Sequence, residues 1–452
     1  MEKREPATLV IGAGIAGIQA SLDIADAGFK VYLVEREPTI GGRMAQLDKT
    51  FPTLDCSSCI LTPKMVDAGR HPNIELLTYS EVVDVQGQMG DFQVKVKKKP
   101  RYVHEELCTG CSLCVEACVW KKVPSEFDAG VAMRSAAYIP FPQAVPLKAV
   151  IDENTCLYLT KGKCGRKCEK ACERGAIDFE MKEEWVDLNV GAIIVATGFD
   201  PFDPRLKPEF AYGVYDNVIT GLEFERLSSA SGPTQGKILI NGQVPKDVVF
   251  IHCVGSRDKN LGNEYCSRVC CMYTAKQAHL VREKMPEANI TVFYMDVRAF
   301  GKGFEEFYDR VRMEGARYRR GNPSEIYQRG DPSTGSGQSS GQGKLIVRAE
   351  DTLLSEPLEV EADLVVLAVG VTPRADAQEL ADLLGISLSP DGFFQEAHPK
   401  LHPVETGVEG IYLAGCCQGP KDVPDTVAQG KAAASSAIVV LSKMKREAET
   451  EQ

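Results

Sequence analysis

Residues 7–17 have the sequence ATLVIGAGIAG, and this stretch decides the fold of the chain. Its first five residues predict a buried parallel strand, and helical spacing follows Gly12, Gly14 and Gly17. A second predicted strand, residues 30–34, ends at Glu35. Glycines at such a turn let the backbone approach a pyrophosphate at a helix N-terminus, and the acid accepts hydrogen bonds from a ribose. Strand, loop, helix, strand and acid therefore predict a dinucleotide-binding unit.

Three further segments resemble the parts of disulfide-reductase-like flavoproteins that surround FAD. They are residues 35–43, which end in a glycine pair and an arginine, residues 191–198 (GAIIVATG) and residues 410–415 (GIYLAG). The resemblance favours FAD over NAD at the first glycine loop. Cys416 departs from the family, which usually has Asp there, and a redox role for Cys416 and Cys417 stays open. The expected FAD-binding residues are Gly12, Gly14, Gly17, Glu35, Arg36, Gly42, Arg43, Ala196, Thr197, Gly198, Gly415 and Cys416.

Eight of the sixteen cysteines lie between residues 108 and 172, within the flavin-binding frame, and they form two groups. The first group has the spacing C-x2-C-x2-C-x3-C, typical of bacterial ferredoxins, in which the fourth cysteine ligates the other [4Fe–4S] cluster. The second is less regular but ends in a ferredoxin-like CERGAI, residues 172–177. Zinc is the alternative, and a run of four with both spacings favours clusters. The expected ligand sets are Cys108, Cys111, Cys114 and Cys172 for one cluster, and Cys118, Cys156, Cys164 and Cys168 for the other.

A second nucleotide-type domain is predicted from residue 244, without its glycine loop. Residues 247–251 (DVVFI) predict its first strand, and HCVGSR follows where G-x-G-x-x-G is expected. A pyrophosphate would lose the backbone cradle that fixes it. Four cysteines nearby are enough for a third [4Fe–4S] cluster, and a mixture of buried thiols is the alternative. These cysteines are Cys253, Cys266, Cys270 and Cys271.

Across nearly all of its length the chain resembles the A subunit of heterodisulfide reductase. The stretches that carry the resemblance are residues 51–65 (FPTLDCSSCILTPKM), 138–146 (YIPFPQAVP), 253–271 and 419–422 (GPKD). The resemblance implies an iron–sulfur flavoprotein that works with B and C subunits and an electron-input protein or ferredoxin. It also favours a third cluster at the four cysteines between residues 253 and 271 over a mixture of buried thiols. In methanogens the family's FAD bifurcates electrons between ferredoxin and a disulfide.

Many members of that family carry an extra N-terminal cluster domain and C-terminal ferredoxin domains. We expect a short form without them, which acts as a relay core dependent on partners, and bifurcation within this chain alone is not expected. Related short flavoproteins serve sulfur, sulfate and benzoyl-CoA electron-transfer complexes. The complex to which the chain belongs therefore stays open, and we expect a dimer of a hetero-oligomer.

Cys56 and Cys59 form a C-x-x-C pair soon after the second flavin loop. Dithiols at a similar topological place in disulfide reductases take electrons directly from the flavin, so the pair is the candidate catalytic group. The resemblance suggests another role, in which the pair shares a cluster with ligands from a second domain or from a partner. Structural thiols are the third alternative.

Composition is ordinary for a globular protein, with 44% hydrophobic and 25% charged residues. No apolar run approaches the roughly 20 residues that span a bilayer. The net charge of −11 disfavours nucleic-acid binding. Many cysteines without a secretion signal indicate a reducing cytoplasm, where thiols serve as metal ligands or redox groups.

These patterns together predict an α/β flavoprotein of the thioredoxin-reductase-like type, with two dinucleotide domains and an inserted α+β ferredoxin domain. The FAD-binding domain is expected in three parts, residues 1–104, 181–243 and 363–452. The insert covers 105–180, the cysteine-bearing nucleotide-type domain covers 244–362, and 331–343 is a predicted flexible loop.

The predicted function is electron transfer between FAD and [4Fe–4S] clusters within a heterodisulfide-reductase-like complex, of which the chain is one subunit. Whether flavin-based bifurcation occurs in that complex stays open. One alternative is a self-contained NAD(P)H-dependent dithiol–disulfide oxidoreductase using Cys56 and Cys59. The other is a scaffold protein whose cofactors are redox-silent.

Overall fold

The computed structural model describes residues 5–328 and 344–450, so the predicted loop at 331–343 lies outside the described residues. The chain forms two compact units. The first consists of Met1–Ala45, Ser58–Phe199 and Pro373–Gln452, and the second of Gln46–Ser57 and Asp200–Thr372. The described part of the chain contains no helix with the length and apolarity needed to cross a membrane.

The core of the first unit is a five-stranded parallel sheet in the order β22-β11-β1-β2-β3. Both faces are covered, which explains why β1 is buried along its whole length and is apolar except at Thr8. Parallel strands bring all five carboxyl ends to one edge, where ligands of such folds bind. The strands are β1 (Ala7–Ile11), β2 (Lys30–Glu35), β3 (Ile74–Thr78), β11 (Ala192–Val195) and β22 (Ile411–Leu413).

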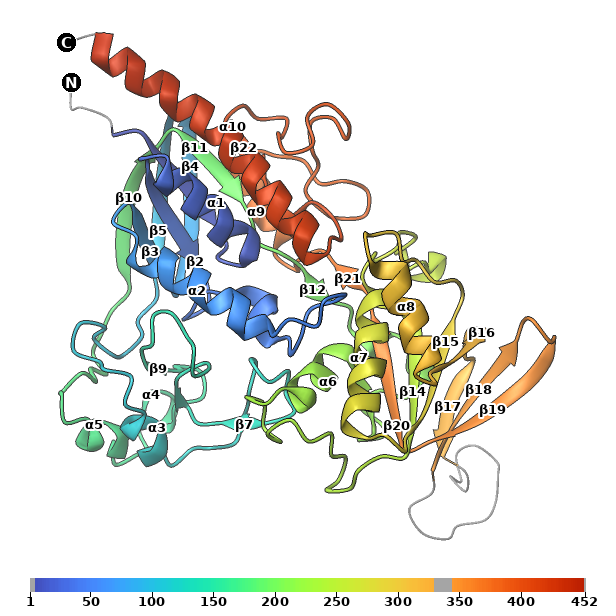
Figure 1. Ribbon diagram of the computed structural model, residues 1–452. Coiled ribbons are helices and arrows are strands. Elements are labelled where there is room, and N and C mark those ends of the chain that lie inside the picture. Colours follow the sequence, from blue (N-terminus) through green and yellow to red (C-terminus); the bar gives the residue numbers. More distant parts are fainter. Residues whose placement is uncertain (1–4, 329–343, 451–452) are drawn as a thin grey trace. The chain divides into compact units, whose positions relative to one another are not determined.

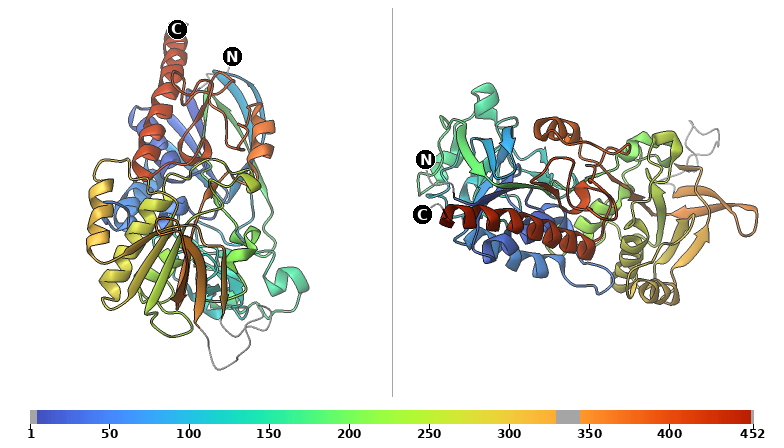
Figure 2. Two further views of the ribbon diagram at one scale, coloured as in Figure 1. Left: turned by 90° about the vertical axis from the view of Figure 1, so that its right-hand side faces the viewer. Right: turned by 90° about the horizontal axis from the view of Figure 1, so that it is seen from above.

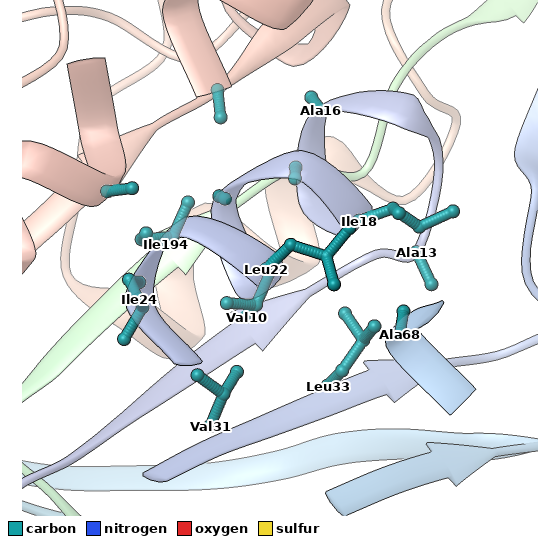
Figure 3. Close-up of a cluster of buried hydrophobic side chains, with 14 of the residues drawn as sticks. Val10, Ala13, Ala16, Ile18, Leu22, Ile24, Val31, Leu33, Ala68 and Ile194 are labelled. Carbon is teal, nitrogen blue, oxygen red and sulfur yellow. The ribbon is translucent and has the colours of Figure 1, made fainter. Parts of the chain in front are cut away.

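Helices cover one face of this sheet (Figure 1). Val10 of β1 and Leu33 of β2 pack there against Ile18 and Leu22 (Figure 3). Leu9, whose side chain alternates to the other face, packs against an antiparallel sheet in the order β10-β5-β4. The helices are α1 (Ile15–Asp26), α2 (Ser57–Arg70) and α10 (Val423–Thr450), and the second layer consists of β4 (Ser80–Gln88), β5 (Asp91–Lys98), β10 (Glu184–Val190) and α9 (Ala377–Leu384).

The cysteine-rich insert belongs to the first unit and contains two similar short helices. In each case a residue with positive φ, Ser112 (+66°) or Arg166 (+49°), precedes a helix with a buried cysteine in its first turns. The two helices, α3 and α5, contact each other. The elements of the insert are α3 (Leu113–Ala117), α4 (Leu157–Lys161), α5 (Lys167–Ala171), β6 (Val123–Pro124), β7 (Met133–Arg134), β8 (Ala137–Tyr138) and β9 (Val150–Ile151).

The second unit is built on a parallel sheet in the order β13-β20-β14-β15-β16. Helices lie on one face, and an antiparallel sheet of β17, β18 and β19 packs on the other (Figure 2). The sheet strands are β13 (Val218–Thr220), β14 (Asp247–Val254), β15 (Asn289–Tyr294), β16 (Arg317–Arg320) and β20 (Leu364–Val369). The covering elements are α6 (Gly221–Ser228), α7 (Cys270–Lys284), α8 (Phe304–Met313), β17 (Glu325–Gln328), β18 (Leu345–Asp351) and β19 (Glu356–Ala362).

Residues 46–57 join the second unit through a buried ion pair. The Lys276 ammonium lies 2.7 Å from the Glu225 carboxylate, and their side chains are only 1% and 2% exposed. Lys276 also donates to the Lys49 carbonyl at 2.8 Å, while Glu225 accepts from the Asp48 amide at 3.0 Å. Because every charged group is matched, this pair holds the segment that carries Cys56 in the second unit.

Replacement of Lys276 by Met should destabilise the protein strongly, because it leaves the Glu225 carboxylate buried without its counter-ion. We expect a loss of about 3 to 5 kcal/mol in the free energy of unfolding, measured with urea. The matched control is Lys431→Met on α10, whose ion pair with Asp23 has side chains 55% and 24% exposed. That control should cost less than about 1 kcal/mol. Equal effects of the two changes would contradict the importance of the buried pair.

Candidate functional site

Three loops converge at the carboxyl edge of the sheet in the first unit. Gly12 has φ +99°, and a Cβ on it would lie 2.5 Å from the Ala196 carbonyl oxygen. A Cβ on Gly17 would lie 1.9 Å from the Gly12 oxygen, and one on Gly42 would lie 3.0 Å from the Gly14 Cα. Only glycines permit this approach, so the first loop, the second loop and the end of β11 are held together.

Open space remains beside this crowded backbone. Gly14 is the N-cap of α1, where no side chain caps the helix, and a Cβ added to it would meet no heavy atom within 4 Å. A Cβ added to Gly198 would likewise meet no heavy atom within 4 Å. Within the described residues, the hydroxyl of the neighbouring Thr197 is buried without a hydrogen-bond partner. Helix N–H groups that face open space bind pyrophosphates, so the loop has the features of a dinucleotide cradle.

Glu35 lies at the end of β2 and is fixed by two backbone amides. Its carboxylate oxygens accept from Ala13 N–H at 2.8 Å and Glu37 N–H at 3.0 Å. Burial raises the pKa of Glu35 to about 7, and the two amides partly oppose that rise. Each oxygen keeps a lone pair that a ribose hydroxyl can use. Arg36 instead points its guanidinium at Asp376, which precedes α9.

Gly415 and the following cysteines form a single 3-10 turn after β22 (Gly415–Cys417). The Gly415 amide donates to the Gln429 side chain of α10 at 2.8 Å, a contact that the sequence pattern did not indicate. Cys416 and Cys417 are buried, and burial raises the pKa of both thiols, that of Cys417 to about 11. Protonated thiols are poor nucleophiles, which favours structural roles for them.

The first expected cluster set is brought together from separate segments of the insert. The pKa of the Cys114 thiol is raised to about 12, mainly by burial and also by interaction with the other three thiols of the set. Two of these sulfurs accept backbone N–H groups, Cys108 from Ala149 at 3.5 Å and Cys172 from Ala176 at 3.3 Å. Such bonds are a common means of tuning cluster potentials. The set consists of Cys108, Cys111, Cys114 and Cys172, and Cys114 also interacts with Cys168 of the second set.

The second expected set surrounds a cavity in the insert. Burial raises the pKa of Cys168 to about 11, and interaction with its three set members raises it as well. All four sulfur-bearing residues line this cavity together with Trp120 and Tyr158. The set consists of Cys118, Cys156, Cys164 and Cys168.

The third set stands where the second unit would hold a pyrophosphate loop, between β14 and α7. Cys253 is the penultimate residue of β14 and has φ +59°, a left-handed conformation that non-glycine residues seldom adopt outside functional sites. Cys270 and Cys271 open α7 and are buried. Burial raises the pKa of Cys270 well above its ordinary value, and interaction with Cys253, Cys271 and Cys266 adds to this rise.

The three sets share one electrostatic property that bears on their ligand. In each set at least one thiol has a raised pKa, partly because ionised neighbours repel it. Four thiolates so close together need compensating positive charge, which the irons of a cluster supply. No three His, Cys, Asp or Glu side chains in residues 5–328 and 344–450 are placed to hold a single metal ion. Each cysteine of a cubane binds a different iron, so cluster ligands need not meet that arrangement.

Cys56 and Cys59 are exposed and disulfide-bonded, while the other fourteen cysteines are free. Cys56 directly precedes α2 and pairs with Lys49 in an isolated antiparallel bridge, and Cys59 lies in the first turn of α2. A C-x-x-C pair at a helix N-terminus is typical of redox-active dithiols.

Similarity to known proteins identifies the class of this chain and then its family. Residues 8–56 match the FAD dependent oxidoreductase family, so the glycine loop with Glu35 belongs to an FAD-dependent oxidoreductase. A protein of Archaeoglobus profundus named for its likeness to the A subunit of heterodisulfide reductase is 48% identical over 97% of this chain, which covers 67% of it. The chain therefore belongs to the family of heterodisulfide reductase A subunits.

Two other relatives are more similar in sequence. The A subunit of the H2:CoB-CoM heterodisulfide,ferredoxin reductase of Methanothermobacter marburgensis is 55% identical over 96% of this chain. The second iron-sulfur A subunit of the CoB–CoM heterodisulfide reductase of Methanopyrus kandleri is 58% identical, also over 96%. The chain spans 64% of the length of each.

Solved structures confirm the predicted fold. Thioredoxin reductases of T. acidophilum and Lactococcus lactis each match 97% of the chain with a TM-score of 0.52 and 14% identity. The matches cover 99% and 100% of those chains, respectively. The likeness at this identity concerns the fold, with its two dinucleotide-type domains.

Replacement of Gly14 by Ala should separate FAD binding from folding. Its Cβ would occupy the open space at the helix N-terminus without meeting protein atoms, so the free energy of unfolding of the apoprotein should change by less than about 1 kcal/mol. FAD should bind about 100-fold more weakly by fluorescence titration, or about 2.7 kcal/mol. Gly407→Ala, at an exposed position with equal room, should bind FAD normally. Normal FAD affinity of Gly14→Ala would contradict the cradle.

Replacement of Cys270 by Ser tests the third set. If it holds a cluster, anaerobically purified wild-type protein should contain about twelve irons per chain, and the variant should lose about four. Cys417→Ser, also a buried free thiol, is the matched control and should keep its iron. Unchanged iron in Cys270→Ser would leave the chain with about eight irons and refute the third cluster.

Proposed function

We propose that the chain is an electron-transfer flavoprotein with one FAD and three [4Fe–4S] clusters, the core subunit of a heterodisulfide-reductase-like complex. The observation that carries the proposal is the combination, within the first unit alone, of a dinucleotide cradle with two four-cysteine sets. FAD exchanges one or two electrons and a cluster one, so together they convert between two-electron and one-electron partners.

The protein's own residues supply binding and placement in this proposal. The N-terminus of α1 beside Gly14 binds the pyrophosphate, and Glu35 orients the adenosine ribose by accepting from its hydroxyls. Gly42 and the end of β11 close the cradle from either side. The remaining expected contacts with FAD are those of Arg36, Arg43, Thr197, Gly415 and Cys416, and they are part of the same proposal. The division of the chain into an FAD domain, a ferredoxin insert and a cysteine-bearing domain is part of it as well.

A nicotinamide-dependent reductase is the less favoured interpretation. Residues 255–269, between β14 and α7, contain no glycine loop, and four cysteines stand in and around them. The chain's relatives are heterodisulfide reductase subunits, whereas the thioredoxin reductases share only the fold. Electrons therefore reach the flavin through protein partners.

The partners in this proposal are B- and C-like subunits and an electron-input protein or ferredoxin. Subunit designations and the word ferredoxin occur in the names of the relatives, which supports an assembly of this kind. The complex is assigned to the cytoplasm, whose reducing conditions keep cluster cysteines available. Cys56 and Cys59 retain the roles of flavin-coupled dithiol, ligands of a shared cluster, or structural disulfide.

Reduction of the flavin by different donors tests the proposal. The anaerobically purified chain should lose its flavin absorbance on mixing with a reduced two-cluster ferredoxin, and should keep it with NADH or NADPH. Dithionite serves as the control that both flavin and clusters can be reduced. Bleaching by NADH but not by ferredoxin would favour the disulfide-reductase alternative, and no reduction by any donor would favour a scaffold.

A further inference from the structure

The two cysteine sets of the insert lie on chain segments of opposite charge. Residues 104–117, which carry three cysteines of the first set, contain three glutamates and no lysine or arginine. Residues 118–122 and 156–168 carry the whole second set and contain no aspartate or glutamate. Their basic residues are Lys121, Lys122, Lys161, Lys163, Arg166 and Lys167. In a chain with net charge −11, this concentration of positive charge needs an explanation.

The five lysines of these segments are exposed and uncompensated. Within the part of the chain that the structure describes, none of their ammonium groups has an acidic partner, and only Arg166 forms an ion pair, with Glu169 at 3.3 Å. Elsewhere in the first unit some lysines do form ion pairs, as Lys30 does with Glu75 and Lys431 with Asp23. We call residues 118–122 and 156–168 the basic surface.

The basic surface borders the cavity of the second cysteine set. Lys167 and Val119 line that cavity with the four cysteines, and Val119 is 52% exposed. Helices α4 and α5, which carry Lys161 and Lys167, lie with α3 in the insert (Figure 1). An exposed apolar residue amid unpaired positive charge, directly beside a redox site, is the arrangement that a transient protein contact uses.

We propose that the basic surface docks an electron-carrier protein through an acidic face on that carrier, beside the second cluster set. The inference rests on the proposed electron-transfer function and specifies its partner. Opposite charges steer association, raising on-rates by about 10- to 1,000-fold at low salt, and they exclude carriers of the wrong sign. A nucleic acid is less favoured, because the chain's net negative charge repels a long polyanion away from this surface.

Binding of an acidic two-cluster bacterial ferredoxin to the holoprotein tests this surface. Wild-type affinity, measured by biolayer interferometry, should fall steeply as salt rises from about 20 to about 300 mM, roughly the range over which screening grows. Lys161→Glu/Lys163→Glu and Lys121→Glu/Lys122→Glu should each weaken binding about tenfold or more. Lys443→Glu/Lys445→Glu, which changes exposed lysines of α10 by the same charge, should bind as wild type.

Several outcomes would overturn the proposal. They are no ferredoxin binding at low salt, equal weakening by the α10 control, and equally tight binding of the cationic carrier cytochrome c. Tighter lysine-dependent binding of duplex DNA or of phosphatidylserine vesicles would assign the surface to those ligands instead. Iron content and dithionite reduction of the same samples separate the two hypotheses. If the samples contain all of their clusters in reducible form but both lysine variants bind ferredoxin as wild type does, only the docking surface is refuted. If the clusters are absent, the proposed function is refuted.

Discussion

The close approach of backbone at Gly12 is the constraint on which the first unit depends. A side chain there would collide with the Ala196 carbonyl, and one at Gly17 would collide with Gly12 itself. Without these contacts the turn after β1 could not meet the end of β11, and α1 could not begin where its N-terminus faces open space. The cradle is thus a consequence of packing that leaves room for no Cβ, and Glu35 completes it from the next strand.

Charge compensation is the second principle common to the molecule. The buried Lys276 and Glu225 balance each other and in doing so hold residues 46–57 in the second unit. The cysteine sets have no such balance among their own side chains, since burial and mutual repulsion oppose ionisation of their thiols. In the proposed function a cluster would supply the missing positive charge, and its irons would then contribute to the stability of the insert as well as to electron transfer.

The charges of the insert bear directly on the proposed function. Its two similar helices place the sets side by side, while the surrounding segments give the first set an acidic border and the second a basic one. The first unit alone therefore holds a dinucleotide cradle, two candidate cluster sites and a charged surface. The second unit keeps the nucleotide-type sheet but has cysteines at the place of its phosphate loop.

Patterns confined to a few neighbouring residues could be predicted from the sequence. Gly12, Gly14 and Glu35 indicate the dinucleotide unit because strand, turn and helix are local, and the spacing from Cys108 to Cys118 identifies the ferredoxin loop because one loop surrounds a cluster. The sequence also determined, by the absence of the usual glycine pattern after residue 251, that the second domain lacks its usual ligand loop.

Only the tertiary structure decided contacts between residues distant in the chain. It placed Gly42 against Gly14, joined Arg36 to Asp376, and held Gly415 through Gln429. The tertiary structure also assigns residues 46–57 to the second unit and divides the chain after Phe199 and Thr372. A local pattern records which face of an element is buried, but not which distant element covers it, because that depends on how the whole chain packs.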